Sequence, residues 1–310
     1  ENNFFETPLL KYKNMPGAAQ FFPDKEDLSC EKGGDLEVCQ CSGCGLEMDL
    51  SQVGTFPGIA SMSLVRDLAG ERLGPYEVLE LIGMGGMGVV YKAKDLETGK
   101  VVALKVLYCG YLKKADFIAR FEREARTLLR LDDPNIVKIF ASGEQDGIYY
   151  LATELLHGET LAQYLQSRTL DFKEVIRIMT QVCSAIAHAH SQGVIHRDIK
   201  PANIILDNGS VKVLDFGLSH LTGGESQFST LTRSDLAMGS FNYLSPEQRM
   251  NAKGVDRRSD IFSLGVVFYE MLTGSLPLGH FVPPSKTGHG IPAKCDRIVE
   301  RALNVNPGQR

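Results

Sequence analysis

The residues with the clearest chemical potential lie in two short stretches in the second half of the chain. One stretch, at positions 195–203, reads IHRDIKPAN, and the other, at positions 215–217, reads DFG. They supply Asp198, Lys200, Asn203 and Asp215. Phosphoryl transfer depends on alignment and charge neutralisation, and carboxylate and amide oxygens are suitable ligands for Mg²⁺. The pattern therefore indicates transfer of a phosphoryl group from a Mg-bound nucleotide to a hydroxyl.

A glycine-rich turn lies upstream of these stretches. The sequence IGMGGMGVV begins at Ile82 and places Gly83, Gly85 and Gly88 in the spacing Gly-x-Gly-x-x-Gly. Dinucleotide-binding turns share this spacing, but there the glycines run into a helix. Here they run into the strand-like VVYKAK, which favours a flap whose backbone N–H groups lie over phosphates. For this motif alone, a glycine hairpin without a ligand is the alternative.

Lys105 stands among apolar residues in the sequence VALKV. A buried lysine must be paired, and the next helix offers two carboxylates, Glu122 and Glu124. Glu124 lies closer to the apolar face of that helix, so we expect it to be the partner that directs the ammonium toward phosphates. A surface lysine on an edge strand is the alternative interpretation.

The elements that must position these residues begin at Tyr76. Alternating and helical periodicities predict a β-rich part followed by a mostly helical part. The predicted strands are Tyr76–Ile82, Gly88–Lys94, Val101–Leu107, Ile136–Phe140 and Ile148–Glu154, and the predicted helices include Asp116–Leu131 and an apolar stripe of Val175, Ile178, Met179, Val182, Ile186 and Ala189. The fold class is therefore α+β, with a small β-rich lobe containing one helix and a larger helical lobe.

With these motifs in order, residues 76–310 resemble the bacterial, eukaryotic-like (Hanks-type) serine/threonine protein kinases. The motifs are GMGGMGVVYKA, VALKV, FEREA, HRDIKPAN, DFGLS, GSFNYLSPEQ and SDIFSLGVVFYEMLTG. The Ser-Pro-Glu triplet and the short LPLGHFVPPS tail are similar to bacterial members. The resemblance implies a bilobal protein kinase fold and an ATP-dependent enzyme that phosphorylates serine and threonine in proteins, with Mg²⁺ or Mn²⁺.

The resemblance also implies individual roles. Asp198 would orient the acceptor hydroxyl and take its proton, Lys200 would reach the transferring phosphoryl group, and Asn203 and Asp215 would bind the metal ion. The backbone carbonyl of Glu154 and the N–H of Leu156 would bond the adenine edge. Thr153 would take the gatekeeper place and leave a back pocket open. The full set of implied nucleotide contacts is Ile82, Gly83, Met84, Gly85, Gly86, Met87, Gly88, Val90, Ala103, Lys105, Glu124, Glu154 and Leu156.

Control elements are implied in the same way. The polar segment after Asp215 looks like an activation loop, with Arg197 available to pair with a phosphate. We expect autophosphorylation at Thr232 or Ser234, with Thr230 third; the other hydroxyls are Thr222, Ser226 and Ser229. Ser240 would bond Asp198 or Lys200. Glu247 and Arg310 would form a structural ion pair, and the kinase domain would continue beyond Arg310.

A cysteine cluster lies in the first part of the chain, residues 1–75, which we expect to be a separate segment and linker. Cys30, Cys39, Cys41 and Cys44 could enclose a tetrahedral Zn²⁺. Unligated or redox-active thiols are the alternative, since the cluster contains only one regular Cys-x2-Cys. We expect three further cysteines to be reduced core residues of a cytoplasmic protein, namely Cys109, Cys183 and Cys295.

Composition excludes several other classes of protein. The formal net charge of −5 over 310 residues argues against nucleic-acid binding. No apolar run reaches the roughly 18 residues of a membrane span, and no secretory signal is visible. ATP and protein substrates are the expected partners, with a dimer as the arrangement for trans-autophosphorylation. The alternatives are a pseudokinase scaffold without turnover and a small-molecule kinase of the same fold.

Overall fold

The computed structural model describes residues 28–33, 36–41, 47–49, 68–85, 88–107, 115–216, 240–250, 255–288 and 290–310. The chain divides into two units, residues 1–66 and residues 67–310. The predicted boundary between residues 75 and 76 differs from this division because Leu68 and Leu73 are buried in the second unit. Within the described part, no helix is long and apolar enough to cross a membrane.

The first unit contains a small antiparallel sheet. Its strands are β1 (Leu28–Gly33), β2 (Leu36–Cys41) and β3 (Glu47–Asp49), in the order β1-β2-β3. The register of β1 and β2 pairs the backbones of Cys30 and Cys39. Cys44 lies outside the described residues.

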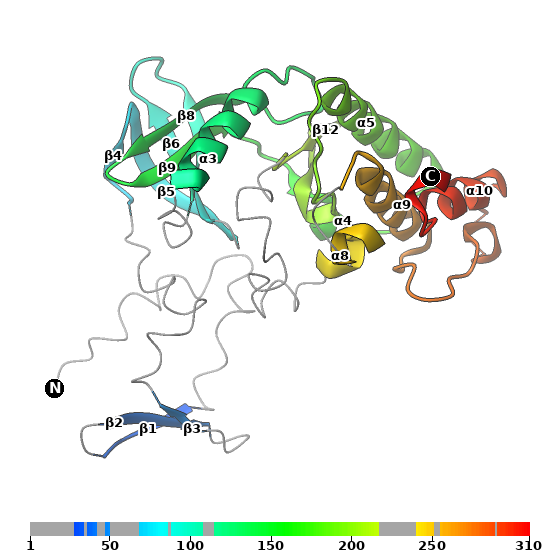
Figure 1. The fold of residues 1–310 in the computed structure, drawn as a ribbon, viewed down its shortest axis with the longest axis horizontal. Coiled ribbons are helices and arrows are strands. Elements are labelled where there is room, and N and C mark those ends of the chain that lie inside the picture. The colour runs from blue at the N-terminus through cyan, green and yellow to red at the C-terminus, as the bar shows by residue number, and fades with distance from the viewer. Residues whose placement is uncertain are drawn as a thin grey trace. The chain divides into compact units, whose positions relative to one another are not determined.

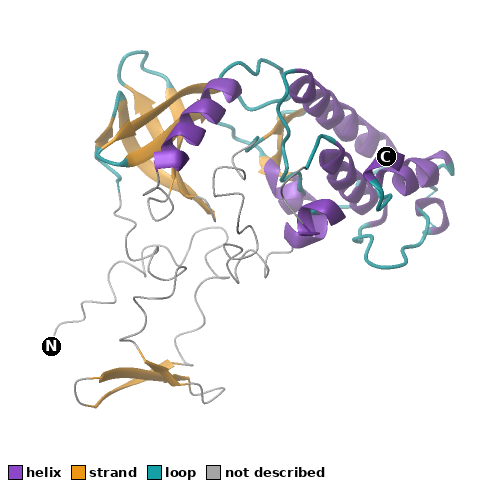
Figure 2. Cartoon of the chain, in the orientation of Figure 1, coloured by secondary structure: helices purple, strands orange, loops and turns teal. Residues whose placement is uncertain are grey.

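The second unit begins with a six-stranded antiparallel sheet (Figures 1 and 2). Its order is β4-β5-β6-β7-β9-β8, with bounds β4 (Arg72–Leu73), β5 (Tyr76–Gly85), β6 (Gly88–Asp95), β7 (Val101–Leu107), β8 (Ile139–Gln145) and β9 (Ile148–Glu154). Burial along β6 and β7 alternates, as expected for strands with one face on a core. The β6–β7 turn forms because Asp95 Oδ1 accepts hydrogen bonds from the backbone N–H groups of Glu97 and Thr98.

The two edge strands of this sheet are joined by a side chain. Gln145 at the end of β8 accepts a hydrogen bond from the Gly74 N–H at 2.6 Å, directly after β4. The Tyr150 ring packs against Gly74 and Gly143, where a Cβ atom would overlap the Tyr150 hydroxyl. Residues 68–75 are therefore part of the lobe that holds the glycine-rich turn.

One helix, α3 (Ala115–Leu128), covers this sheet (Figure 1). Its buried residues include Phe121, Ala125 and Leu128, which share the helical face that the sequence predicted. The predicted strand Ile136–Phe140 starts later, because Ile136 first bridges Val213 in the other lobe and β8 begins only at Ile139.

The rest of the unit is mostly helical (Figure 2). Its helices are α4 (Leu161–Ser167), α5 (Phe172–Ser191), α8 (Pro246–Met250), α9 (Arg258–Thr273) and α10 (Lys294–Ala302), and β10 (Glu159–Thr160), β11 (Ile204–Asp207) and β12 (Ser210–Val213) form a small sheet. Thr160 caps α4 with a reciprocal box to Gln163, and Asp171 caps α5. The predicted α5 stripe is buried in full and packs in one core with α9 and α10.

The cysteines outside the first unit are not all core residues. Cys295 is buried, as predicted, and carries a free thiol. Cys183 also carries a free thiol but is exposed, which corrects the prediction. The reason is helical geometry, because Cys183 follows the inward-facing Val182 and lies off the buried stripe of α5. Cys109 lies outside the described residues.

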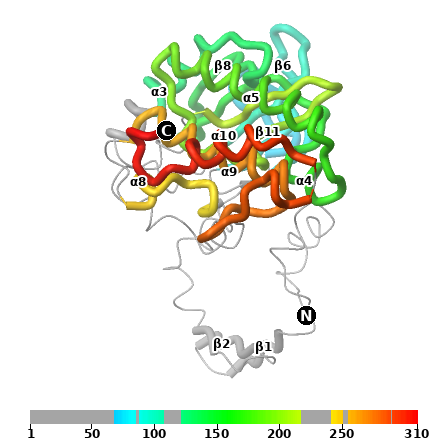
Figure 3. The backbone as a smooth tube through the Cα atoms, turned by 90° about the vertical axis from the view of Figure 1, so that its right-hand side faces the viewer, coloured from blue at the N-terminus to red at the C-terminus, as the bar shows by residue number. Residues whose placement is uncertain are grey.

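The end of the chain packs against α8 (Figure 3). The buried Arg310 guanidinium makes a two-pronged ion pair with the Glu247 carboxylate, with Nη2 donating to Oε2 at 2.8 Å. Arg310 also donates to the carbonyls of Asn304 and Arg258. The predicted Glu247–Arg310 pair is therefore formed, and it ties α8 to Arg310.

Candidate active site

The catalytic-loop residues converge on the Asp198 carboxylate. The Lys200 ammonium lies 2.9 Å from Asp198 Oδ2. Asn203 donates from Nδ2 to the Asp198 carbonyl at 2.8 Å and to Oδ2 at 3.0 Å. These three residues therefore form one connected group in which the carboxylate is oriented from two sides, as general-base chemistry requires.

A buried aspartate holds the backbone of this loop in place. Asp260, at the start of α9, is fully buried and accepts hydrogen bonds from the N–H groups of His196 and Arg197, at 2.9 and 2.8 Å. The same carboxylate bonds His190 on α5. The sequence analysis assigned no role to Asp260, although it lies in the SDIFSLG motif. Its position at the start of an apolar helix was the available signal.

Two residues of the site have backbone dihedrals that are uncommon outside glycine. Arg197 has φ 67° and Asp215 has φ 58°. Gln248 donates to the Arg197 carbonyl at 2.8 Å, while His196 bonds the carbonyl of Leu214, immediately before Asp215. These contacts maintain both conformations, because such strain persists only where surrounding structure fixes it.

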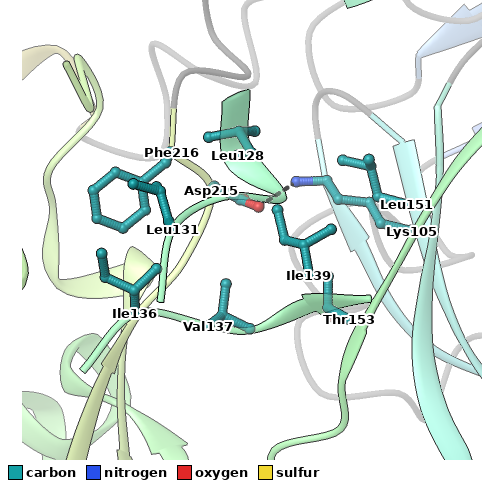
Figure 4. A pocket seen from close by; sticks show the side chains of 10 residues that line it. All are labelled: Lys105, Leu128, Leu131, Ile136, Val137, Ile139, Leu151, Thr153, Asp215 and Phe216. Atoms are coloured by element: carbon teal, nitrogen blue, oxygen red, sulfur yellow. Dashed lines mark hydrogen bonds and ion pairs between the residues drawn. The ribbon is translucent and has the colours of Figure 1, made fainter. Parts of the chain in front are cut away.

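Asp215 and Lys105 form an ion pair across the lobes (Figure 4). Lys105 Nζ lies 2.6 Å from Asp215 Oδ1. Burial works against the charged carboxylate, but the Lys105 ammonium outweighs it and holds the pKa of Asp215 below its ordinary value. The phosphate-binding lysine and the metal-binding aspartate of the sequence analysis are therefore brought together.

The predicted Lys105–Glu124 ion pair is not formed in this structure. Glu124 instead forms an ion pair with its neighbour Arg123 at 3.4 Å, and its carboxylate acts electrostatically on Arg197 in the catalytic loop. Burial lowers the pKa of Arg197, and Glu124 and Asp260 oppose that shift. Lys105 instead binds the closest carboxylate available, which is Asp215.

A cavity opens behind Lys105 and Thr153 (Figure 4). Its walls are mostly apolar, and its lining residues are Lys105, Leu128, Leu131, Ile136, Val137, Ile139, Leu151, Thr153, Asp215 and Phe216. The single hydrogen of the Thr153 hydroxyl is shared between two backbone carbonyls, those of Ala103 at 3.4 Å and Glu154 at 3.3 Å. The small side chain thus leaves space at the position where the sequence analysis expected a back pocket.

The predicted adenine contacts lie at the junction of the two lobes. Glu154 ends β9, and Leu156 follows in the connection to the helical lobe. The Glu154 N–H donates to the Lys138 carbonyl at 2.9 Å, and its side chain is bound by Lys212. The adenine hydrogen bonds of the Glu154 carbonyl and the Leu156 N–H stay predictions.

The glycine-rich turn joins β5 to β6 as a strand–turn–strand, as predicted. Gly83, Met84 and Gly85 lie at the end of β5, and Ile82 and Met84 are exposed. A Cβ atom on Gly88 would overlap the Val106 carbonyl, so this position requires glycine. Val90 and Ala103 are half-buried on β6 and β7, while Gly86 and Met87 lie outside the described residues.

The donor set fits a magnesium ion. Leu214 donates its N–H to the Asn203 carbonyl at 2.9 Å, which brings the chain at Asp215 beside Asn203. Among the described contacts, no donor takes Asn203 Oδ1 or Asp215 Oδ2, so an amide oxygen and a carboxylate oxygen remain for a hard cation. The described side chains contain no group of three or more His, Cys, Asp or Glu that could hold a metal, so phosphate and water oxygens would complete the shell.

The expected control segment lies largely outside the described residues. This applies to Thr222, Ser226, Ser229, Thr230, Thr232 and Ser234, and to the side chain of Ser240. Ser240 itself begins a short 3-10 helix, Ser240–Tyr243. Tyr243 donates to Glu270 on α9 at 2.7 Å, and Ser263 donates to the Tyr243 carbonyl, so this segment is fixed to the helical lobe.

Comparison with known proteins identifies the family. The model of the protein kinase domain family matches residues 76–307. The chain belongs to this family. Its relatives include the serine/threonine-protein kinase PrkC of Bacillus subtilis, 44% identical over 260 residues, and PknB of Mycobacterium tuberculosis, 35% identical over 255 residues. These alignments place the chain with the bacterial Hanks-type serine/threonine kinases, as the motifs indicated.

The kinase domain is only part of these relatives. The alignments cover 78% of this chain and 39% of PrkC, and 76% of this chain and 40% of PknB, so the chain spans about two fifths of their length. The solved PknI kinase domain of M. tuberculosis matches with a TM-score of 0.64 at 28% identity, covering 78% of this chain and 92% of that chain. This likeness confirms the kinase fold, with a β-sheet lobe and a helical lobe.

Proposed function

We propose that this chain transfers the γ-phosphoryl group of ATP to serine and threonine hydroxyls of proteins. The observation that carries this proposal is the connected group of Asp198, Lys200 and Asn203, held on a loop whose backbone is fixed by the buried Asp260. Family membership supports the same activity.

Each residue of the group has a distinct task in this reaction. Asp198 accepts a hydrogen bond from the substrate hydroxyl and takes its proton as the hydroxyl oxygen bonds to the γ-phosphorus and the bond from that phosphorus to the departing ADP oxygen breaks. Lys200 keeps the carboxylate oriented and supplies positive charge beside the transferring group. Asn203 restrains Asp198 and offers its amide oxygen to a metal ion. Positioning provides most of the rate enhancement, since an aligned acceptor avoids the entropic cost of a bimolecular encounter.

Asn203 and Asp215 would hold Mg²⁺ or Mn²⁺, which neutralises charge on the phosphates when bound. Asp215 can serve the metal only with the oxygen that Lys105 leaves free, or after Lys105 has turned to the nucleotide phosphates. Glu124 would then become the partner that orients Lys105.

The direct test is transfer of radiolabelled γ-phosphate to a generic basic protein by the wild-type chain and by Asp198→Asn. The wild type should label the protein, and the variant should lose activity by about 10² to 10⁴-fold while still binding nucleotide. A wild type that binds ATP but transfers nothing would favour the pseudokinase alternative. Transfer to small alcohols but not to proteins would favour the small-molecule alternative.

Autophosphorylation of the segment after Asp215 is the proposed form of regulation. Thr232 and Ser234 are the first candidates and Thr230 the third, and a phosphate there would be drawn to Arg197. Incubating Asp198→Asn with the wild type distinguishes reaction between two copies from reaction within one. Phosphate found by mass spectrometry on the inactive copy supports a transient dimer, and an active enzyme without modification in this segment contradicts the proposal.

We also propose a cytoplasmic location, on the basis of the ATP substrate and the free thiols. ATP is a cytoplasmic substrate, and Cys183 and Cys295 are free thiols, which persist in reducing compartments. Protein substrates would reach the site from the same compartment.

A second proposed function concerns the first unit, where we infer a structural Zn²⁺ site. The register places Cys30 opposite Cys39, and Cys41 lies two residues further along β2. Residues at this spacing share one face of a hairpin, and Cys44 follows shortly after. The register therefore supports a site that includes Cys30, Cys39 and Cys41, and Cys44 is the proposed fourth ligand.

Elemental analysis of the whole chain tests the zinc proposal. One zinc per chain is expected in the wild type and in the control Cys183→Ser, whose thiol lies on α5. Loss of zinc in Cys41→Ser would support the site. A wild-type chain that contains no zinc after purification and binds none when it is added would contradict it.

A further inference from the structure

An ion pair joins the end of the large sheet to the small sheet of the helical lobe. Lys212 Nζ, on β12, lies 2.6 Å from Glu154 Oε1, at the end of β9. The side chains are 17% and 25% exposed, so water screens the pair only partly. The two residues are 58 positions apart and belong to different lobes.

The segment that joins α3 to β8 contacts both partners of this pair. Glu154 Oε1 also accepts the Lys138 N–H at 2.8 Å, and the Glu154 N–H donates to the Lys138 carbonyl. Lys212 donates to the Ile136 carbonyl at 3.4 Å. Ile136 in turn bridges Val213 in parallel. One carboxylate and one ammonium thus fix the residues 136–138 to both lobes at once.

Both partners lie next to groups that handle the nucleotide. Glu154 is the residue whose carbonyl is expected to bond adenine. Lys212 lies on β12, three residues before Asp215. Leu214, between β12 and Asp215, has its carbonyl bonded to His196. A change in the Lys212–Glu154 distance would therefore alter the spacing between the base-binding backbone and the metal-binding carboxylate.

We propose that Lys212 is a positioning residue for nucleotide binding, acting through Glu154. The proposal rests on the proposed kinase function. The Lys212 ammonium is occupied by the Glu154 carboxylate and a backbone carbonyl, so its effect is on geometry and not on a direct contact with ATP. A nucleotide spans the distance from adenine to metal, so its affinity is sensitive to this spacing, whereas a protein substrate that binds the helical lobe is not.

The experiment compares Lys212→Met and Glu154→Gln with the wild type. Glu154→Gln keeps an oxygen for the Lys138 N–H but removes the charge. In both variants we expect the ATP dissociation constant, measured with a fluorescent nucleotide, and the KM for ATP to rise by about three- to tenfold, as for loss of a partly screened ion pair. The KM for a peptide substrate should stay unchanged. The double variant should be no weaker than either single variant, because both remove one interaction.

Two further variants separate positioning from general stability. Lys92→Met removes the exposed ion pair with Glu80, which lies wholly within the sheet lobe, and should leave ATP affinity unchanged. Lys212→Arg keeps the charge and should retain near wild-type ATP affinity. If Lys212→Met does not fold, Glu154→Gln and Lys212→Arg still decide the question.

Several outcomes would each overturn the proposal. They are unchanged ATP affinity in both charge-removing variants, an equal rise in the peptide KM, and additive effects in the double variant. Higher turnover with unchanged ATP affinity would also overturn it, because the pair would then restrain the lobes without positioning nucleotide. The ATP dissociation constant is measured without phosphoryl transfer. An inactive wild type would therefore count against the kinase function, while the effect of Lys212 on nucleotide affinity could still be determined.

Discussion

The loop that carries Asp198 and the helix that carries Glu124 are held in different ways. Asp198 is fixed by Lys200 and Asn203, and its backbone is fixed through the buried Asp260. Glu124 lies on α3 with a 26% exposed side chain and an ion pair to its own neighbour. Contacts within the helical lobe therefore fix the conformation of the catalytic loop, whereas the position of α3 leaves Lys105 without its expected partner.

The difference shows where this fold can change state. Breaking the Asp198 group would deprive the buried Asn203 amide and the partly buried Asp198 and Lys200 charges of these partners, which is costly. Exchanging Asp215 for Glu124 at Lys105 replaces one ion pair with another, so we expect this change to cost less free energy than breaking the Asp198 group. We expect regulation to act on α3 and Lys105 and not on the catalytic loop.

Asp260→Asn should have the largest effect, because it removes the charge that holds two backbone N–H groups and His190. We expect a loss of about 3 kcal/mol in the free energy of unfolding, as for weakening charge-assisted hydrogen bonds to a buried carboxylate. Chemical unfolding measures the loss, with the exposed Glu300→Gln as the control. A stability equal to that of the control would show that the catalytic loop is not fixed by this carboxylate.

Asn203→Ala should lower turnover by about a hundredfold, because Asp198 loses an orienting hydrogen bond and a metal ion loses an amide oxygen. The measurement is kcat at saturating ATP over a series of Mg²⁺ concentrations. A requirement for more Mg²⁺ should accompany the loss. Wild-type turnover with an unchanged Mg²⁺ dependence would contradict the assigned roles.

Glu124→Gln should reduce kcat about tenfold and leave the free energy of unfolding unchanged, since Glu124 is not paired with Lys105 in this structure. Glu122→Gln is the matched control, because Glu122 pairs with Arg126 on the exposed side of α3. Equal activity of both variants would mean that Lys105 does not require Glu124 in the active state. A large loss of stability in Glu124→Gln would contradict the comparison itself.

The smallest effect expected is on stability, where Lys105→Met should change the pH dependence of the free energy of unfolding. The folded pKa of Asp215 is depressed, so the pair stabilises the protein above the unfolded carboxyl pKa of about 3.9 and the stabilisation is lost as pH falls through the folded value. Wild type should exceed the variant by about 1 kcal/mol near pH 7, since Asp215 is partly exposed, and the difference should shrink toward pH 3. A difference that stays constant with pH would exclude the Lys105–Asp215 pair as its source.

Much of the fold was predictable because its signals are local. The strand Ile148–Glu154, the β6–β7 hairpin and the buried stripe of α5 follow from alternation, turn residues and helical spacing. The start of β8 was not predictable, because Ile136 pairs first with a strand distant in sequence. The exposure of Cys183 was not predicted, because burial in a helix depends on which side of the helix a residue lies and not on whether its neighbours in sequence are apolar.

The sequence by itself determined the chemistry of the site, since the types and order of Asp198, Lys200, Asn203 and Asp215 suit one reaction whatever their exact placement. Only the tertiary structure decided which charges meet. Lys105 forms its ion pair with Asp215 and not with Glu124, and Lys212 forms one with Glu154. Such pairs join residues far apart in sequence, so they depend on how the lobes and α3 are packed. Spacing along the chain carries no information about these distances.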